Sequence, residues 1–363
     1  AWLQESEPFR LLGAATEFGS QLQPAEVKPG VMRIGGSVDD FQLNDWLALR
    51  HEFDLPGEGG SPLPLELAMQ RLHLIPSVIE PGGAEWRAGE IPPYDISVED
   101  FAYEAITLGK VVLRGRSEGK RLLVDVLRVN APNFSVVTDG QWTEGGGSRF
   151  AVKLSSDNFG SMMRDLGFVS VISGGKANAE GRLTWPGSPA AFDMGKLGGE
   201  LHVRIDEGTM EDVDPGAGKL LGLLSLQALP KRLFLDFSDI SKKGLQFSRL
   251  EGDFRFADGN ALTQNLHLES SPANMLVTGR TGLVARDFEQ LIAVVPNVSG
   301  TVSVAGALAW GPQAAAVLLV LQKLFQSDID AATMTRYELT GSWSAPKLTK
   351  LDPLESSTTG GGQ

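Results

Sequence analysis

Side chains that could carry out acid–base or metal chemistry are few and scattered in this sequence. The four histidines, His51, His73, His202 and His267, show no spacing typical of metal ligands, and there is no cysteine. A chain without cysteine has no disulfide, no thiolate nucleophile and no Cys-ligated metal. His202 and His267 fall at polar positions of predicted strands, so we expect both on the solvated surface.

The densest group of carboxylates is Asp212, Asp214, Asp236 and Asp239. Paired acids can act as general acid and base or hold a divalent cation. Asp214 precedes a proline and is explained as a helix cap, while Asp236 and Asp239 suit a turn after a strand. The glycine-bearing loops lack the Lys-Ser/Thr of a phosphate-binding loop, and no G-x-S-x-G elbow is present. The residues therefore predict a non-enzymatic protein with no metal and no cofactor, and an envelope hydrolase is the weakest alternative.

Composition narrows the class of partner. The chain has 363 residues, a formal net charge of −13 and 42% hydrophobic residues. A nucleic-acid partner would need a basic stripe, and docking on an anionic leaflet would need basic charge as well. We therefore expect no nucleic acid, and any lipid contact through apolar surface.

Period-two alternation of apolar and polar residues dominates the chain and predicts strands. Leu201, Val203 and Ile205 alternate with polar residues, and Leu262, Leu266 and Leu268 do the same. Turn residues, Gly109 among them, separate the predicted strands. We expect strands over residues 31–34, 65–69, 101–108, 111–115, 121–129, 134–142, 150–154, 169–173, 176–185, 197–207, 245–256, 262–269, 274–280, 290–295 and 337–343. Helices are expected at 44–50 and, capped by Asn158, at 158–166.

Two hairpins resemble one another. Residues 127–140 and 266–280 both run from an apolar alternation through a proline-containing turn to an apolar strand that ends in Thr and Gly. This internal echo indicates a sheet extended by repeated units. Chance similarity between two hairpins is the alternative, since turn residues recur in any meander.

Two leucine-rich segments, 220–230 and 314–325, predict helices that are apolar around most of their circumference. Both are far shorter than the roughly 20 residues that span a bilayer. Such a helix is buried in a core or contacts another apolar surface.

An antiparallel sheet with one apolar face must bury that face. Two folds meet this requirement: a β-sandwich, or one strongly curved sheet that wraps around its own apolar face and leaves a groove. The alternation alone fits both.

Several long strings make the sequence similar to a known family. They are PGAGKLLGLLSLQALPKRLFLDFSD with the following KKGLQF, then GRLTWPGSPAAF, GLVARDFEQLIAVVPNV, GALAWGP and YELTGSWSAP. They closely resemble the C-terminal region of the YhdP branch of the AsmA-like family. The match is dense from residue 181 onward and looser before it.

The resemblance implies an elongated, U-shaped hydrophobic β-groove that shields acyl chains of phospholipid between the inner and outer membranes of a Gram-negative envelope. On this interpretation the groove-lining candidates are Leu201, Val203, Ile205, Leu262, Leu266, Leu268, Met275, Val277, Val302 and Val304. The leucine-rich helices would close the groove or contact the receiving membrane through Leu220, Leu221, Leu223, Leu224, Val317, Leu318, Leu321 and Phe325.

The resemblance also implies a place and partners. We expect a periplasmic location, with an N-terminal inner-membrane anchor that precedes this chain in the full-length protein, because residues 1–10 lack the features of a signal peptide. The expected partners are phospholipid and the inner leaflet of the outer membrane or an envelope protein. The expected parts are an irregular entry with a short helix (1–60), a first β-meander (61–180), the C-terminal region (181–352) and a disordered tail (353–363). The alternative function is a structural or protein-interaction module that binds no lipid itself.

Overall fold

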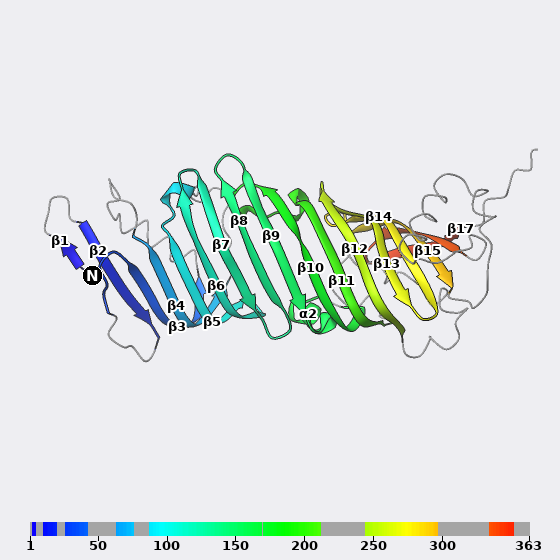
Figure 1. Cartoon of the computed structure of the whole chain (residues 1–363), viewed down its shortest axis with the longest axis horizontal. Coiled ribbons are helices and arrows are strands. Elements are labelled where there is room, and N and C mark those ends of the chain that lie inside the picture. Colours follow the sequence, from blue (N-terminus) through cyan, green and yellow to red (C-terminus); the bar gives the residue numbers. More distant parts are fainter. Residues whose placement is uncertain are drawn as a thin grey trace, which may run out of the picture. The chain divides into compact units, whose positions relative to one another are not determined.

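The computed structural model describes residues 2–4, 10–19, 26–42, 63–75, 87–168, 170–211, 244–296 and 334–351. Within these ranges the chain is mainly β, with one α-helix and three short 3-10 turns (Figure 1). It divides into two compact units. Unit 1 comprises Ala1–Ser156, Asp165–Gly167 and Glu180–Lys196, and unit 2 comprises Asp157–Arg164, Phe168–Ala179 and Leu197–Gln363.

Unit 1 is an open sheet in which strands that follow one another in the chain lie side by side. Strands β2 to β5 are parallel, whereas β1–β2 and all pairs from β5 to β9 are antiparallel. The strands are β1 (Trp2–Gln4), β2 (Arg10–Phe18), β3 (Met32–Gln42), β4 (Leu65–Ile75), β5 (Tyr94–Tyr103), β6 (Ile106–Glu118), β7 (Arg121–Asn130), β8 (Ser135–Thr143) and β9 (Gly147–Ser156). The 3-10 turns are η1 (Ala88–Glu90), η2 (Pro189–Ala191) and η3 (Met194–Lys196).

The parallel strands correct the expectation of an antiparallel sheet throughout, and β2 lies where no regular element was expected. The long connections between these strands permit parallel pairing. A parallel pair needs a crossover of about a dozen residues or more, because the chain must return to the same end of the sheet. Residues 19–31, 43–64 and 76–93 supply such connections. The hairpins after β5 are short, and they pair antiparallel.

Unit 2 contains most of the helix α2 (Phe159–Asp165) and a run of antiparallel strands that pair in chain order. Strand β10 (Ile172–Pro186) contributes its first residues to unit 2, where the backbone N–H of Glu211 donates to the carbonyl of Val171 at 2.7 Å. The other strands are β11 (Gly198–Met210), β12 (Leu245–Ala257), β13 (Asn260–Ser270), β14 (Ala273–Gly282), β15 (Asp287–Pro296), β16 (Thr335–Ser342) and β17 (Ala345–Leu351). Figure 1 shows this sheet curling back from β12 toward β17.

The helix prediction near residue 158 is confirmed, with its cap. The side chain of Asn158 accepts a hydrogen bond of 2.9 Å from the backbone N–H of Ser161. This contact satisfies one of the donors that a helix leaves free at its start. Met162 and Met163 are buried on the helix.

The turn expected at Gly109 is wrong. The chain turns at Glu104, whose φ is +52°, and Gly109 (φ +62°) lies inside β6 opposite Phe101, where the pairing register shifts. Glycine tolerates the positive φ of such a bulge as readily as that of a turn. Strand β17 was not predicted, since its Pro346 and two lysines are residues that strands generally avoid.

The internal echo is confirmed at the level of strand pairing. Leu127 pairs with Thr138 and Val124 with Gly140, with a register shift between them. In the second hairpin Leu266 pairs with Val277 and Thr263 with Gly279, again with a shift between them. Equivalent positions differ by a constant 139 residues, so the two hairpins share both sequence pattern and bulge.

Each unit is thus one curved, unclosed layer, and among the described residues no second sheet packs on it as a sandwich would require. The leucine-rich segments, the 44–50 helix, His51, Val302 and Val304 lie outside the described residues, as does the group Asp212, Asp214, Asp236 and Asp239. So do the membrane-contact candidates Leu220, Leu221, Leu223, Leu224, Val317, Leu318, Leu321 and Phe325.

Candidate functional site: the apolar face of the sheet

Apolar side chains form continuous rows across the strands of unit 1. Residues paired directly on neighbouring strands carry their side chains on the same face. Pairing therefore defines three rows from β3 to β9. They are Ile34–Leu67–Ile96–Leu113–Leu127–Thr138–Val152, Gly36–Met69–Val98–Val111–Val129–Val136–Leu154 and Met32–Leu65–Tyr94–Gly115–Val124–Gly140–Phe150.

The rows are apolar and only partly covered. Thr138 is the one side chain in the first two rows that is polar, and its hydroxyl donates to the carbonyl of Ala151 at 2.6 Å. Met69 and Val98 are buried, but Leu113, Leu127 and most other members are half-buried. With strands about 4.8 Å apart, the rows extend on the order of 30 Å. Unit 1 therefore carries a long apolar strip with access for a hydrophobic ligand.

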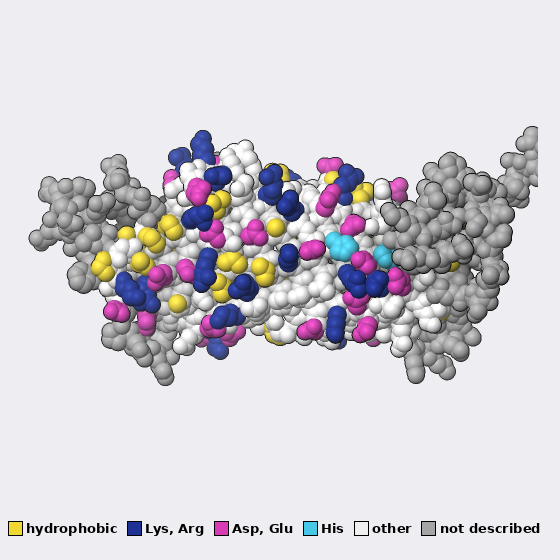
Figure 2. Space-filling model, in the orientation of Figure 1, with side chains coloured by type: hydrophobic (Ala, Val, Ile, Leu, Met, Phe, Trp, Pro, Cys, Tyr) yellow, Lys and Arg dark blue, Asp and Glu magenta, His cyan; other side chains and the backbone are white. Residues whose placement is uncertain are grey.

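The opposite face of unit 1 carries ion pairs between neighbouring strands. Arg114 Nε lies 3.0 Å from a carboxylate oxygen of Asp95, and Lys110 Nζ lies 2.7 Å from one of Glu99. Figure 2 shows a face of the molecule on which such cationic and anionic side chains are interspersed. Exposed pairs of this kind contribute about 0–1 kcal/mol each. These pairs make this face more polar than the apolar rows, although Val126 and Val137 also lie on it.

The apolar face of unit 2 is closed to water. Ile205, Leu250, Ile292 and Leu339 are fully buried at 0% exposure. Leu250 pairs with Leu268, and Leu268 with Met275, so these side chains share one face. The side chains of this face pack as a hydrophobic core.

Eight of the predicted groove residues are described, and all lie in unit 2. Those with 0–3% exposure are Ile205, Leu266, Leu268, Met275 and Val277. Leu201 and Val203 are half-buried on the same face, opposite Phe254 and Gly252. Their role toward lipid stays a prediction.

Leu262 lies on the other face, which corrects the predicted alternation. It pairs with Arg255 on one side and Arg280 on the other, among charged side chains. The register shift between Thr263 and Leu266 is the cause, because a bulge changes which residues face inward. A strict period of two carried from Leu266 back to Leu262 therefore gives the wrong face.

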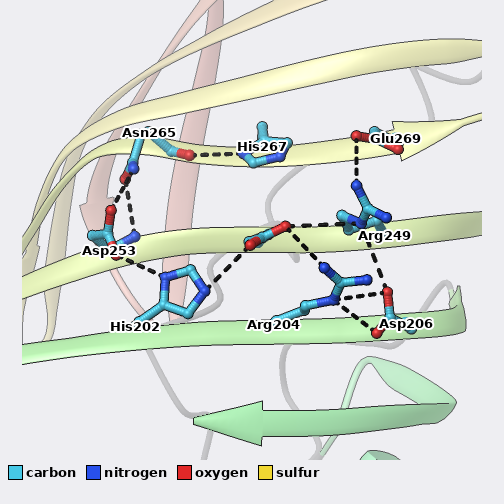
Figure 3. Close-up of polar contacts among 9 residues, drawn as sticks. His202, Arg204, Asp206, Arg249, Asp253, Asn265, His267 and Glu269 are labelled. Atoms are coloured by element: carbon cyan, nitrogen blue, oxygen red, sulfur yellow. Dashed lines mark hydrogen bonds and ion pairs between the residues drawn. The ribbon is translucent and has the colours of Figure 1, made fainter. Parts of the chain in front are cut away.

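The polar face of unit 2 holds a connected network on β11, β12 and β13 (Figure 3). His202 lies between two carboxylates of β12, with Nδ1 2.8 Å from Asp253 and Nε2 3.2 Å from Glu251. His267 contacts the carbonyl of Asn265 at 3.0 Å. The predicted surface position is confirmed for His202, whose side chain is 40% exposed, and is wrong for His267, which is only 7% exposed.

Two aspartates of the network have lowered pKa values. Hydrogen bonding from Arg204 holds the pKa of Asp206 below its ordinary value, and burial only partly opposes this effect. Burial alone would raise the pKa of Asp253, but hydrogen bonds from Asn265 and His202 outweigh it and lower the pKa. Both carboxylates are therefore ionised at neutral pH, as partners in a structural network.

Neither face offers an evident catalytic or metal centre in the part of the chain that the structure describes. There, no group of three or more His, Asp or Glu residues is arranged so that it could hold a metal ion. No described helix has the length and hydrophobicity needed to cross a membrane. His73 Nε2 contacts the carbonyl of Glu104 at 2.8 Å, and its Nδ1 lies 3.5 Å from Asp40. In unit 1, by contrast, the apolar strip keeps most of its side chains only half-buried.

Sequence reasoning selected candidates only in the second half of the chain and missed this strip. The signal was present: Leu65, Leu67 and Met69 alternate with polar residues in the same way as the selected strands. What the sequence does not show is which apolar face remains accessible, because burial depends on how the sheet curls.

Comparison with known proteins identifies the family. A family model described as YhdP protein matches residues 35–348. The intermembrane phospholipid transporter YhdP of Escherichia coli (strain K12) is 27% identical over 223 residues. That alignment covers 60% of this chain but only 18% of the transporter's length. No solved structure shows significant similarity.

Proposed function

Because the chain belongs to the YhdP family, we propose that it takes part in moving phospholipid between the two membranes of a Gram-negative envelope, by shielding acyl chains on its apolar face. The E. coli relative is described as an intermembrane phospholipid transporter. The alignment covers only 18% of that transporter's length. The proposal for this chain therefore concerns one part of such a transport path.

The observation that supports this proposal best is the accessible apolar strip of unit 1. Its central positions Leu113, Leu127 and Val129 are half-buried rather than closed. Covering such side chains with lipid yields about 25 cal/mol for each Å² of apolar surface removed from water. The strip is on the order of 30 Å long, comparable to the hydrocarbon thickness of a bilayer.

The proposed mechanism is physical rather than covalent. Acyl chains would lie along the strip while the charged face stays in water, and each CH₂ group covered would contribute about 0.8 kcal/mol. The proposed setting is the periplasm, with the outer membrane's inner leaflet or an envelope protein as the receiving partner. The direction of movement would depend on the membranes at either end.

Lipid binding by the chain tests the proposal. Native mass spectrometry after purification would detect bound phospholipid in the wild type. Leu127→Asp places a charge within the strip and should lower the bound fraction at least tenfold. Val126→Asp is the matched control, because Val126 is also half-buried but lies on the other face, opposite Arg114. Equal lipid content in the two variants would exclude the strip as the binding surface.

A further inference from the structure

Three polar side chains lie together within the apolar face of unit 2. Thr263, Thr281 and Gln290 lie on β13, β14 and β15, with exposures of 4%, 1% and 5%. Thr263 and Gln290 both pair with Gly279, and Thr281 is two residues from Gly279 along its strand. The three side chains therefore share one face. Gly279 places no side chain between Thr263 and Gln290.

The hydrogen bonding of this polar trio is incomplete. The Gln290 amide donates to the Thr281 hydroxyl at 2.8 Å. The Thr263 hydroxyl has no hydrogen-bond partner among the described residues. A buried hydroxyl without a partner is destabilising, and native proteins rarely keep one without a reason. The buried Thr138 of unit 1, by contrast, donates to a backbone carbonyl.

The fold itself does not require polar residues here. The repeated hairpin of unit 1 places Val124, Trp142 and Phe150 at the equivalent pairing positions. Val124 and Phe150 both pair with Gly140, as Thr263 and Gln290 pair with Gly279. The same backbone therefore accepts a fully apolar set.

Among the residues that the structure describes, the strand partners of the trio are uncharged. Gln290 pairs with Leu339, and Thr281 pairs with Phe288, both of which are buried. Arg280 and Glu289 alternate onto the opposite face, where they form an ion pair of 3.3 Å. A phosphate or ammonium group placed by the trio would lose its hydration without gaining a counter-charge. A neutral hydrogen-bond acceptor carries no such cost.

We propose that Thr263, supported by Gln290 and Thr281, forms a binding site for the ester carbonyl of a glycerolipid, where the acyl chains join the glycerol. The assignment rests on the proposed function, and it requires the packed side chains of this face, which are closed to water in the structure, to part and admit lipid. The Thr263 hydroxyl donates to the carbonyl oxygen, which satisfies the buried donor. The acyl chains lie against the apolar side chains of the same face.

Competition between ester and ether lipids tests the site. The chain is incubated with an equimolar mixture of a dioleoyl ester phospholipid and the dialkyl ether lipid of equal chain length and head group, and native mass spectrometry gives the bound ratio. One neutral hydrogen bond predicts about a 2- to 12-fold preference for the ester lipid. Thr263→Val keeps the shape of the side chain and should bring the ratio to about one. Thr278→Val, on the opposite face of β14, should leave it unchanged.

The outcomes separate this assignment from the proposed function. Both lipids bound equally by the wild type, or an ester preference kept by Thr263→Val, would overturn the site, and Thr263 would then hold at most a water molecule. No lipid bound by any form would overturn the proposed function and the site with it. Thermal unfolding of Thr263→Val at or above the wild-type temperature would show that a change in lipid ratio is not caused by misfolding.

Discussion

Replacing Gly140 by alanine should weaken the hairpin repeat of unit 1, because the two strands leave no room for a methyl group. An ideal Cβ on Gly140 would lie 2.3 Å from the carbonyl oxygen of Arg149 and 2.5 Å from the Phe150 ring. Ordinary van der Waals contact begins near 3.4 Å. The strands must therefore part by about 1 Å, and overpacking of this kind costs about 1–3 kcal/mol.

Gly35→Ala is the matched control in the same unit. Its Cβ would meet its nearest atom, the carbonyl oxygen of Ala68, at an ordinary 3.4 Å. Native-state hydrogen exchange read by mass spectrometry gives the local free energy of opening for β8 and β9. Gly140→Ala should speed exchange there roughly 5- to 150-fold, whereas Gly35→Ala should have little effect on β3. If exchange in β8 and β9 of Gly140→Ala rises no more than exchange in β3 of Gly35→Ala, the strands next to Gly140 have room for a methyl group and the reasoning is refuted.

Three further predictions concern packing and ionisation. Leu268→Ala should lower the free energy of unfolding by about 2–5 kcal/mol, because Leu268 is 1% exposed. Leu262→Ala, on the charged face, should lower it by less than half as much. Equal losses for the two variants in urea denaturation would contradict the face assignment. The hydrogen bond from Arg280 lowers the pKa of Asp287, so this pair should stabilise the fold above the carboxyl's ordinary pKa of about 3.9 and lose that effect as pH falls below it. Asp287→Asn should reduce the acid sensitivity of thermal unfolding, and an unchanged pH profile would argue against the pair. Burial, together with a nearby carboxylate, raises the pKa of Tyr94 to about 12. Ultraviolet titration should therefore show a tyrosinate phase at high pH that Tyr94→Phe removes. The stability of the fold should fall as pH rises from about 10 through 12, because the unfolded chain ionises its tyrosine first.

Much of the sheet could be predicted from local pattern, because side chains of a strand alternate between two faces and the sequence shows that alternation of apolar and polar residues. The strands expected over 121–129, 134–142 and 274–280 agree within one or two residues at each end with β7 (Arg121–Asn130), β8 (Ser135–Thr143) and β14 (Ala273–Gly282). The Asn158 cap could also be predicted from the sequence, because a short polar side chain before an apolar segment accepts hydrogen bonds from the nearby backbone.

The errors have a common physical origin in features that local pattern does not encode. Gly109 supplies a positive φ for a bulge and not for a turn, and glycine alone does not distinguish the two. Leu262 changes face because a bulge lies between it and Leu266. Accessibility is a property of the whole sheet. Similar alternation gives a half-exposed Leu127 in unit 1 and a fully buried Leu250 in unit 2.

The most direct test of lipid shielding is a protection scan along β7, which is convenient because the chain has no native cysteine. Single substitutions such as Leu127→Cys and Val129→Cys on the strip, and Val126→Cys and Arg128→Cys on the other face, are labelled with a water-soluble maleimide with and without phospholipid vesicles. If the strip shields lipid, bound lipid slows labelling at 127 and 129 at least tenfold and leaves 126 and 128 unchanged. Equal protection on both faces, or none on either, would contradict shielding by the strip.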